Sequence, residues 1–175
     1  LIPESQAFLY LKMMQKLIGF RNITPKLLMD KINTKSGNFR YIASEIMAES
    51  LYKPSSETFR KNLDSDDVKT VYYSIWALGR LRDKSSINKI KKMLKHKDKH
   101  IRIASAWYLA GLGDDSGEKI AIENLNSNEE SVLSTAIDTL FFLRKPNTLE
   151  TIKKIYNIEL SSIDRLTIIR LIGIC

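Results

Sequence analysis

The chain has 175 residues, of which 43% are apolar and 27% charged, and its formal net charge is +8. This composition is typical of a globular domain and argues against a disordered or fibrous chain. No apolar run approaches the roughly 18 residues that a membrane-spanning helix needs, so we expect no membrane span. The single cysteine, Cys175, excludes an intramolecular disulfide framework, and we expect a cytoplasmic protein. The alternative is an exported protein whose signal segment preceded Leu1.

The same arrangement of residues returns every 31 positions along the chain. Large apolar residues recur in one series, and small residues recur in a second series four positions earlier. Recurrence at a fixed period of about 20 to 50 residues indicates stacked structural repeats. We call the first series the leucine column, which consists of Met47, Leu78, Leu109, Leu140 and Leu171. We call the second the small column, which consists of Ala43, Ser74, Ser105, Ala136 and Thr167.

Each period contains a longer and a shorter predicted helix. The longer helix carries its apolar residues at helical spacing, as Ile101, Leu109 and Leu112 illustrate. The shorter helix repeats in phase with it, through Phe59, Ile90, Ala121 and Ile152. In chain order, the predicted hairpins span approximately residues 5–33, 34–64, 65–96, 97–127 and 128–158, and a partial hairpin spans 159–175. We expect one domain over residues 1–175.

Glycine and proline fall where these predicted helices begin or end. Pro25 opens an early helix, Gly111 and Gly113 close the helix that carries Trp107, and Pro146 separates the two helices of its repeat. The final helix, which contains Ile163, Leu171 and Ile174, lacks the polar capping repeat that a solenoid end requires. We therefore expect either a fragment of a longer protein or self-association through this helix.

The repeats resemble a known family in the segments "NFRYIASEIMAESL", "DKHIRIASAWYLAGLGD" and "NEESVLSTAIDTLFFL". These segments are similar to the short, bacterial HEAT-like repeats first recognised in phycobilin lyase subunits. The family's arginine is present at Arg40 and Arg102, whereas Val71, Leu133 and Asp164 replace it in the other repeats. The predicted fold is an all-α, right-handed solenoid of about five hairpins and a final helix. The resemblance implies that the longer helices line its concave face.

Two short motifs could suggest chemistry. The stretch "GLGDDSGE" follows a helix and does not match a phosphate-binding glycine loop, so its glycines indicate a helix end and a turn. His96, Asp98 and His100 could offer metal ligands, but the surrounding lysines would repel a cation, which favours a solvated turn. No histidine remains to pair with Cys175 as a nucleophile. We expect no catalytic residue, no metal site and no cofactor.

The charges are banded along the sequence. Residues 89–102 hold seven Lys or Arg and one Asp, whereas residues 114–130 hold six acids and one Lys. The acids at 114, 115 and 118 flank a helix end and a helix start, where carboxylates are favoured. The basic segment is interpreted as a solvated helix face, with a phosphate-binding or acidic-partner ridge as the alternative. This possible basic patch consists of Lys89, Lys91, Lys92, Lys95, Lys97 and Lys99.

The two tryptophans lie away from the core stripe. Trp76 and Trp107 follow the small column by two residues, about 200° around a helix, so we expect their rings to point outward. Aromatic rings on successive repeats could anchor a partner, and packing over the seam between repeats is the alternative. We expect Trp truncation to weaken binding and leave the fold intact. The predicted partner-binding residues are Tyr41, Tyr72, Trp76, Trp107, Glu45, Arg102 and Asp138.

These observations favour a non-catalytic scaffold or adaptor that binds a protein or peptide on the concave face. The alternative is a nucleic-acid-binding HEAT-like protein, which includes DNA-alkylation-repair glycosylases. Trp76, Trp107 and Asp138 share one column, a faint similarity to the aromatic and acidic residues of those enzymes. A chromophore lyase is suggested by the family name alone, because the sequence shows no pigment site.

Overall fold

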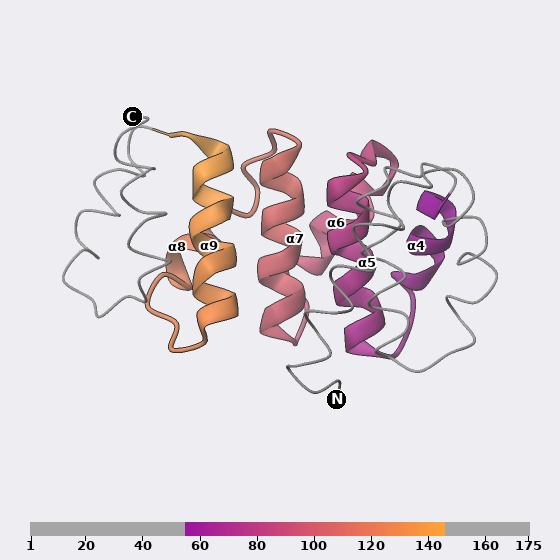
Figure 1. Cartoon of the computed structure of the whole chain (residues 1–175), viewed down its shortest axis with the longest axis horizontal. Helices are drawn as coiled ribbons and strands as arrows, with labels where there is room; N and C mark the ends of the chain where they lie inside the picture. The colour runs from indigo at the N-terminus through magenta and orange to yellow at the C-terminus, as the bar shows by residue number, and fades with distance from the viewer. Residues whose placement is uncertain (1–54, 146–175) are drawn as a thin grey trace, which may run out of the picture. The chain divides into compact units, whose positions relative to one another are not determined.

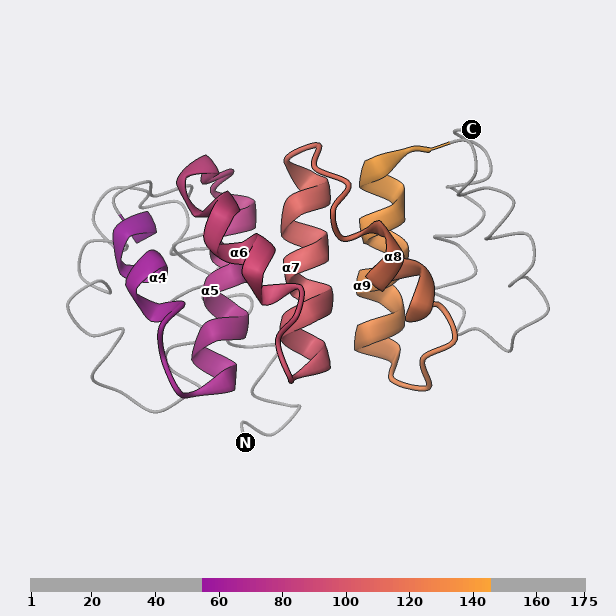
Figure 2. The same cartoon turned by 180° about the vertical axis from the view of Figure 1, so that it is seen from behind.

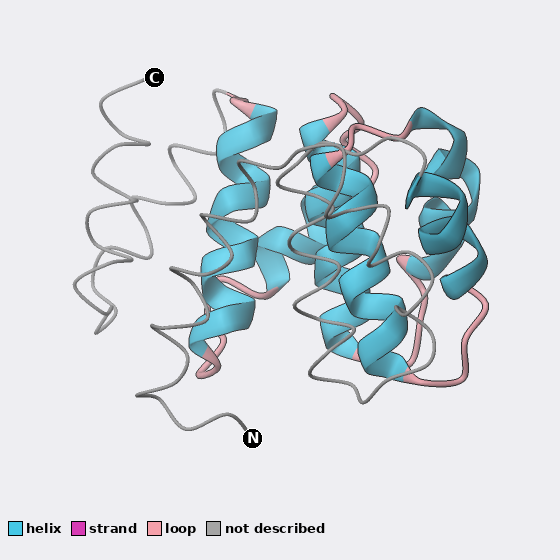
Figure 3. Ribbon diagram, turned by 45° about the vertical axis from the view of Figure 1, so that its right-hand side comes forward, coloured by secondary structure: helices cyan, strands magenta, loops and turns pink. Residues whose placement is uncertain are grey.

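The computed structural model describes residues 55–145 (Figure 1). Within that range the regular structure consists of six α-helices and one 3-10 helix, without a strand (Figure 3). None of these helices combines the length and hydropathy needed to cross a bilayer. The chain divides into two compact units, Leu1–Asp83 and Lys84–Cys175. The predictions made for Tyr41, Glu45, Leu171 and the final helix lie outside the described residues.

The described part of the first unit is a helical hairpin of α4 (Ser56–Asn62) and α5 (Val68–Arg80). The two helices pack against each other, and Phe59 of α4 is fully buried. Asp67 precedes α5 and accepts a hydrogen bond from the backbone N–H of Thr70 at 3.2 Å, which caps the helix start. The guanidinium of Arg60 lies 3.1 Å from the carboxylate of Asp83, so an ion pair links α4 to the residues after α5.

The described part of the second unit has two layers of helices. Its elements are η2 (Lys84–Ser86), α6 (Ile87–Met93), α7 (Lys99–Gly111), α8 (Glu118–Glu123) and α9 (Glu130–Leu143). Helices α7 and α9 lie side by side and pack together in one layer (Figure 1). Helices α6 and α8 lie in the other layer, where α6 packs on α7 and α8 packs on both α7 and α9 (Figure 2).

The helix starts follow the predicted period. The longer helices α5, α7 and α9 begin at Val68, Lys99 and Glu130, which are 31 residues apart. The shorter helices α4, α6 and α8 begin at Ser56, Ile87 and Glu118, again 31 residues apart. The prediction of two helices per period is therefore confirmed for the described residues.

The described residues of the two columns that define the period are buried. Leu78, Leu109 and Leu140 are each 0% exposed. Ser74 and Ser105 of the small column are also buried, and each hydroxyl donates a 2.7 Å hydrogen bond to the carbonyl one helical turn earlier. These bonds satisfy the serine hydroxyls within their own helices, so a polar residue is tolerated where neighbouring helices approach closely.

The connection between α7 and α8 depends on two glycines. Gly113 has φ +82° and follows α7, and the backbone N–H of Asp114 donates to the carbonyl of Leu109 at 2.9 Å, a glycine-terminated helix end. Gly117 precedes α8 and lies against Ala106 of α7. A Cβ atom at Gly117 would lie 2.5 Å from the Cα of Ala106, so only glycine permits this approach.

Candidate functional site

Three aromatic side chains gather on α5 in the first unit. Tyr72 and Trp76 are one helical turn apart, and their ring centroids lie 6.3 Å from each other. The neighbouring ring of Tyr73 meets Tyr72 edge-on at 5.3 Å. All three residues are half-buried. The predicted pair Tyr72 and Trp76 therefore forms one aromatic cluster, which the sequence analysis did not extend to Tyr73.

Trp107 of α7 departs from the expectation of an outward ring. It is only 8% exposed, and its ring meets that of Phe142 on α9 with centroids 6.1 Å apart. Helix α9 packs along α7 and covers the side on which the indole lies. The alternative of packing between repeats fits Trp107. Because truncation would remove a buried ring, we expect Trp107→Ala to lower the free energy of unfolding.

Phe142 is the more exposed of the two rings in this contact, and it was not among the residues predicted from the sequence. It is 43% exposed, and it neighbours the half-buried Phe141, with ring centroids 6.0 Å apart. The guanidinium of Arg144 lies 5.6 Å from the centre of the Phe141 ring, a cation–π contact. Phe142 follows Asp138 by one helical turn, so an extension of the outward column by four residues would have found it.

A glycine occupies the position of the preceding repeat that is equivalent to Phe142. Gly111 lies 31 residues before Phe142 and one helical turn after Trp107. A Cβ atom placed at Gly111 would have no neighbour within 4 Å. The α7 and α9 surface thus has an exposed aromatic ring on one helix and no side chain at the equivalent position of the other. An apolar group of another molecule could contact Phe142 there without displacing a side chain at Gly111.

Arg102, one of the predicted partner-binding residues, has a structural role. Its guanidinium donates hydrogen bonds to the carbonyls of His96 at 2.7 Å and Lys97 at 2.8 Å. Arg102 therefore holds the turn between α6 and α7, where the backbone carbonyls need donors. Asp138 is half-buried on α9. The participation of either residue in partner binding stays a prediction.

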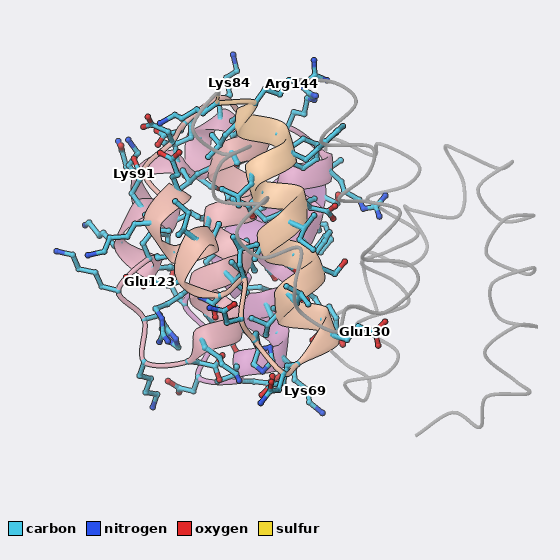
Figure 4. The ribbon with its side chains drawn as sticks, turned by 90° about the vertical axis from the view of Figure 1, so that its left-hand side faces the viewer. Lys69, Lys84, Lys91, Glu123, Glu130 and Arg144 are labelled. Carbon is cyan, nitrogen blue, oxygen red and sulfur yellow. The ribbon has the colours of Figure 1, made fainter. Side chains whose placement is uncertain are left out.

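The basic segment forms α6 and the turn after it. Lys91, Lys92, Lys95 and Lys97 are exposed, whereas Lys89 and Lys99 are half-buried. Figure 4 shows Lys91 and Glu123 on the same side of the second unit, the side of α6 and α8.

Acids of the following repeat neutralise part of this basic segment. The ammonium of Lys91 lies 2.7 Å from Asp114, and Lys99 pairs with Glu129. A third lysine, Lys145, lies 2.6 Å from Asp115 and 2.7 Å from Glu118. The basic and acidic bands seen in the sequence are thus partly paired across neighbouring repeats.

These ion pairs change the titration of the carboxyls. Burial raises the pKa of Asp114, but hydrogen bonds from Lys91 and Ser116 outweigh burial and leave the pKa below its ordinary value. The hydrogen bond from Lys145 lowers the pKa of Asp115, and the hydrogen bond from Lys99 lowers that of Glu129. The carboxylates favour the charged form because a cation contacts each of them.

The residues that precede the longer helices form another column of period 31. Asp98 accepts hydrogen bonds from the backbone N–H groups of His100 at 2.8 Å and Ile101 at 3.3 Å, as Asp67 does from that of Thr70. Glu129 occupies the same position before α9 but makes no capping hydrogen bond. It contacts Lys99 and His100 of the preceding repeat, and the His100 ring lies 3.2 Å from its carboxylate.

Hydrogen bonds engage His96 and Asp98 of the His-Asp-His stretch within the turn between α6 and α7. His96 Nδ1 accepts a 3.0 Å hydrogen bond from the backbone N–H of Asp98, and the Asp98 carboxylate caps α7. Within residues 55–145, no group of three or more histidine, cysteine or acidic side chains is placed to hold a metal ion.

Comparison with known proteins finds a similarity to one family of helical repeats. Residues 56–140 match the family model for HEAT repeats. The fold is similar to a solved structure described as the complex of CpcE and CpcF of phycocyanin lyase from Nostoc sp. PCC7120, with a TM-score of 0.59 and 16% sequence identity over 84% of this chain and 96% of that chain. No curated protein matches the sequence. The resemblance to HEAT-like repeats and the all-α solenoid fold class are confirmed.

Proposed function

We propose that residues 56–140, which match HEAT repeats, belong to a non-catalytic scaffold that binds a protein or peptide partner. In the second unit, the binding surface is the face of α7 and α9 that carries Phe142. In the first unit, the equivalent longer helix α5 contributes Tyr72 and Trp76. Within the first unit we add Tyr41 and Glu45. Within the second unit we add Arg102 and Asp138, and Trp107 supports Phe142 because it is itself nearly buried.

The observation that carries this proposal is the contact between Trp107 and Phe142. A buried indole holds one edge of a ring that is 43% exposed. An aromatic side chain fixed in this way loses little conformational entropy on binding and offers a large apolar surface, which is why aromatic residues dominate binding hot spots. A ring that served packing alone would gain by complete burial.

The similar solved structure supports a protein as the partner, because its description is of a complex between two proteins. Extended repeat surfaces in general bind other macromolecules along several neighbouring repeats. The nucleic-acid alternative has less support, since Lys91 and Lys99 of the basic segment are engaged with carboxylates of the following repeat.

A matched pair of substitutions tests the proposed surface. Phe142 and Ile122 are the two exposed large apolar residues among the described ones, at 43% and 39%, and they lie on α9 and α8 in opposite layers. We expect Phe142→Ser to weaken binding of a partner captured by the wild-type chain by about 2 kcal/mol, the scale of a hot-spot residue. Ile122→Ser removes similar apolar area and should leave binding unchanged.

The measurement is quantitative capture from native lysate followed by titration of the captured protein against each variant. Both variants must show the wild-type circular dichroism spectrum. Equal binding by the wild type and Phe142→Ser, or equal loss in both variants, would contradict a site on the α7 and α9 face.

A further inference from the structure

Three lysines on the α6 side of the second unit differ from the other cations around them. Within the described residues, Lys92, Lys95 and Lys97 are exposed and make no ion pair. Lys91, Lys99, Lys119 and Lys145 of the same unit all pair with carboxylates. We call Lys92, Lys95 and Lys97 the lysine patch.

The backbone holds the three lysines close together. The N–H of Lys95 donates to the carbonyl of Lys92 at 3.2 Å, so the chain continues one helical turn beyond α6. Residues three apart on a helical turn lie on one face, which brings the side chains of Lys92 and Lys95 together. Arg102 fixes the turn further, since its guanidinium donates a hydrogen bond to the carbonyl of Lys97 at 2.8 Å.

The acids near the patch are already engaged. Asp98, the one acid of residues 89–102, accepts hydrogen bonds from two backbone N–H groups at the start of α7, where the helix dipole favours its charge. Asp114 is held by Lys91, and Glu129 by Lys99. The positive charge of the lysine patch therefore lacks a compensating carboxylate among the described residues.

We infer that the lysine patch is a second interaction surface, which binds a short acidic segment of a protein partner. The patch spans six residues of the chain, from 92 to 97, and Glu123 of α8 lies on the same side of the unit as Lys91 (Figure 4). A nucleic acid presents one charge about every 1.7 Å of duplex and would extend beyond the three lysines. A few carboxylates on a flexible segment match the number of charges in the patch.

The side-chain chemistry also favours carboxylates over nucleotides. Lysines act as point charges, whereas specific readout of bases relies on bidentate contacts and stacking on aromatic rings. The residues from Lys92 to Lys97 include no aromatic side chain apart from His96, whose ring accepts a hydrogen bond from the backbone of the turn. This surface is separate from the Phe142 face, so each can be tested without altering the other.

Fluorescence anisotropy with two probes of equal charge tests the inference on the whole chain. One probe is a labelled peptide of alternating glutamate and glycine with six glutamates, and the other is a labelled single-stranded oligodeoxynucleotide with six phosphates. The patch variant is Lys92→Gln, Lys95→Gln and Lys97→Gln. The control variant, Lys61→Gln, Lys69→Gln and Lys84→Gln, changes three other exposed lysines. Each variant lowers the net charge from +8 by three, to +5.

We expect the patch variant to bind the glutamate peptide about tenfold more weakly than the wild type near physiological ionic strength, as the loss of three exposed charge contacts implies. The control variant should change the affinity less than about twofold, because screening confines the effect to nearby charges. Equal weakening in both variants would assign binding to net charge and overturn the inference. Failure of the wild-type chain to bind either probe would also overturn the inference. Tighter binding of the oligonucleotide, lost in the patch variant, would make the surface a nucleic-acid site instead.

Discussion

Glu129 occupies a position at which the two preceding repeats carry aspartate, and one additional methylene group changes the contacts of its carboxylate. Asp67 and Asp98 accept hydrogen bonds from the first turn of their own helices. Glu129 instead contacts Lys99 and His100, which belong to the preceding repeat. The same column of the sequence therefore supplies helix caps in two repeats and a link between repeats in the third.

Packing between α7 and α8 depends on the missing side chain of Gly117. Gly117→Ala would place a Cβ atom 2.5 Å from the Cα of Ala106, and backbone atoms must move to relieve this contact. We expect the free energy of unfolding to fall by about 1–3 kcal/mol, the usual cost of overpacking. Gly111→Ala is the matched control, because its Cβ atom would meet nothing within 4 Å. Chemical denaturation should show Gly111→Ala as stable as the wild type or more so, given the helix preference of alanine. Equal stability of the wild type and Gly117→Ala would show that α7 and α8 are not held this close.

At the scale of helices, ion pairs join elements of successive repeats in the second unit. Lys91 of α6 reaches Asp114 after α7, and Lys145 after α9 reaches Glu118 of α8. Both the basic and the acidic band are visible in the sequence, but the pairing between them is not. The pairing depends on which side chains the packing of the helices brings into contact.

The ion pair of Lys91 with Asp114 predicts a dependence of stability on pH. Because the pKa of Asp114 is lowered in the folded chain, its contribution is complete above the ordinary carboxyl value of about 4 and is lost as the pH falls through the folded value. We expect Lys91→Met to reduce the acid-induced fall in the urea midpoint. Lys92→Met removes an exposed lysine that has no ion pair among the described residues, and should keep the wild-type pH profile. Identical profiles for the wild type and Lys91→Met would contradict the role of this pair.

The aromatic residues mark the limit of what the periodic sequence predicts. The 31-residue period correctly predicted a longer and a shorter helix in each described repeat, because this follows from spacing within one chain segment. The prediction that the Trp107 ring points outward used the spacing of residues in its own helix alone, yet α9 covers the ring. An angular position describes one helix alone, whereas exposure depends on the side chains of the next repeat. Phe142, rather than Trp107, presents the exposed ring as a result.

At the scale of the whole molecule, the described repeats separate two kinds of surface. In the second unit, the layer of α7 and α9 carries the aromatic contact of Trp107 with Phe142. Helices α6 and α8 carry exposed charges, which are Lys91, Lys92, Lys119 and Glu123. Repeat proteins tolerate such a division because each repeat stacks on its neighbours through buried residues, and positions outside those contacts can vary with the partner. The sequence alone could predict that such surfaces exist, but not which aromatic side chain remains exposed.

Site-specific photo-crosslinking tests the proposed binding face most directly. A benzophenone-bearing phenylalanine analogue replaces Phe142 on α9 in one protein and Ile122 on α8 in another, two positions of similar exposure at 43% and 39%. After irradiation in native lysate, we predict one discrete crosslinked protein from position 142, competed away by excess wild-type chain and absent from position 122. The same product from both positions, or from position 122 alone, would contradict a partner bound on the face of α7 and α9.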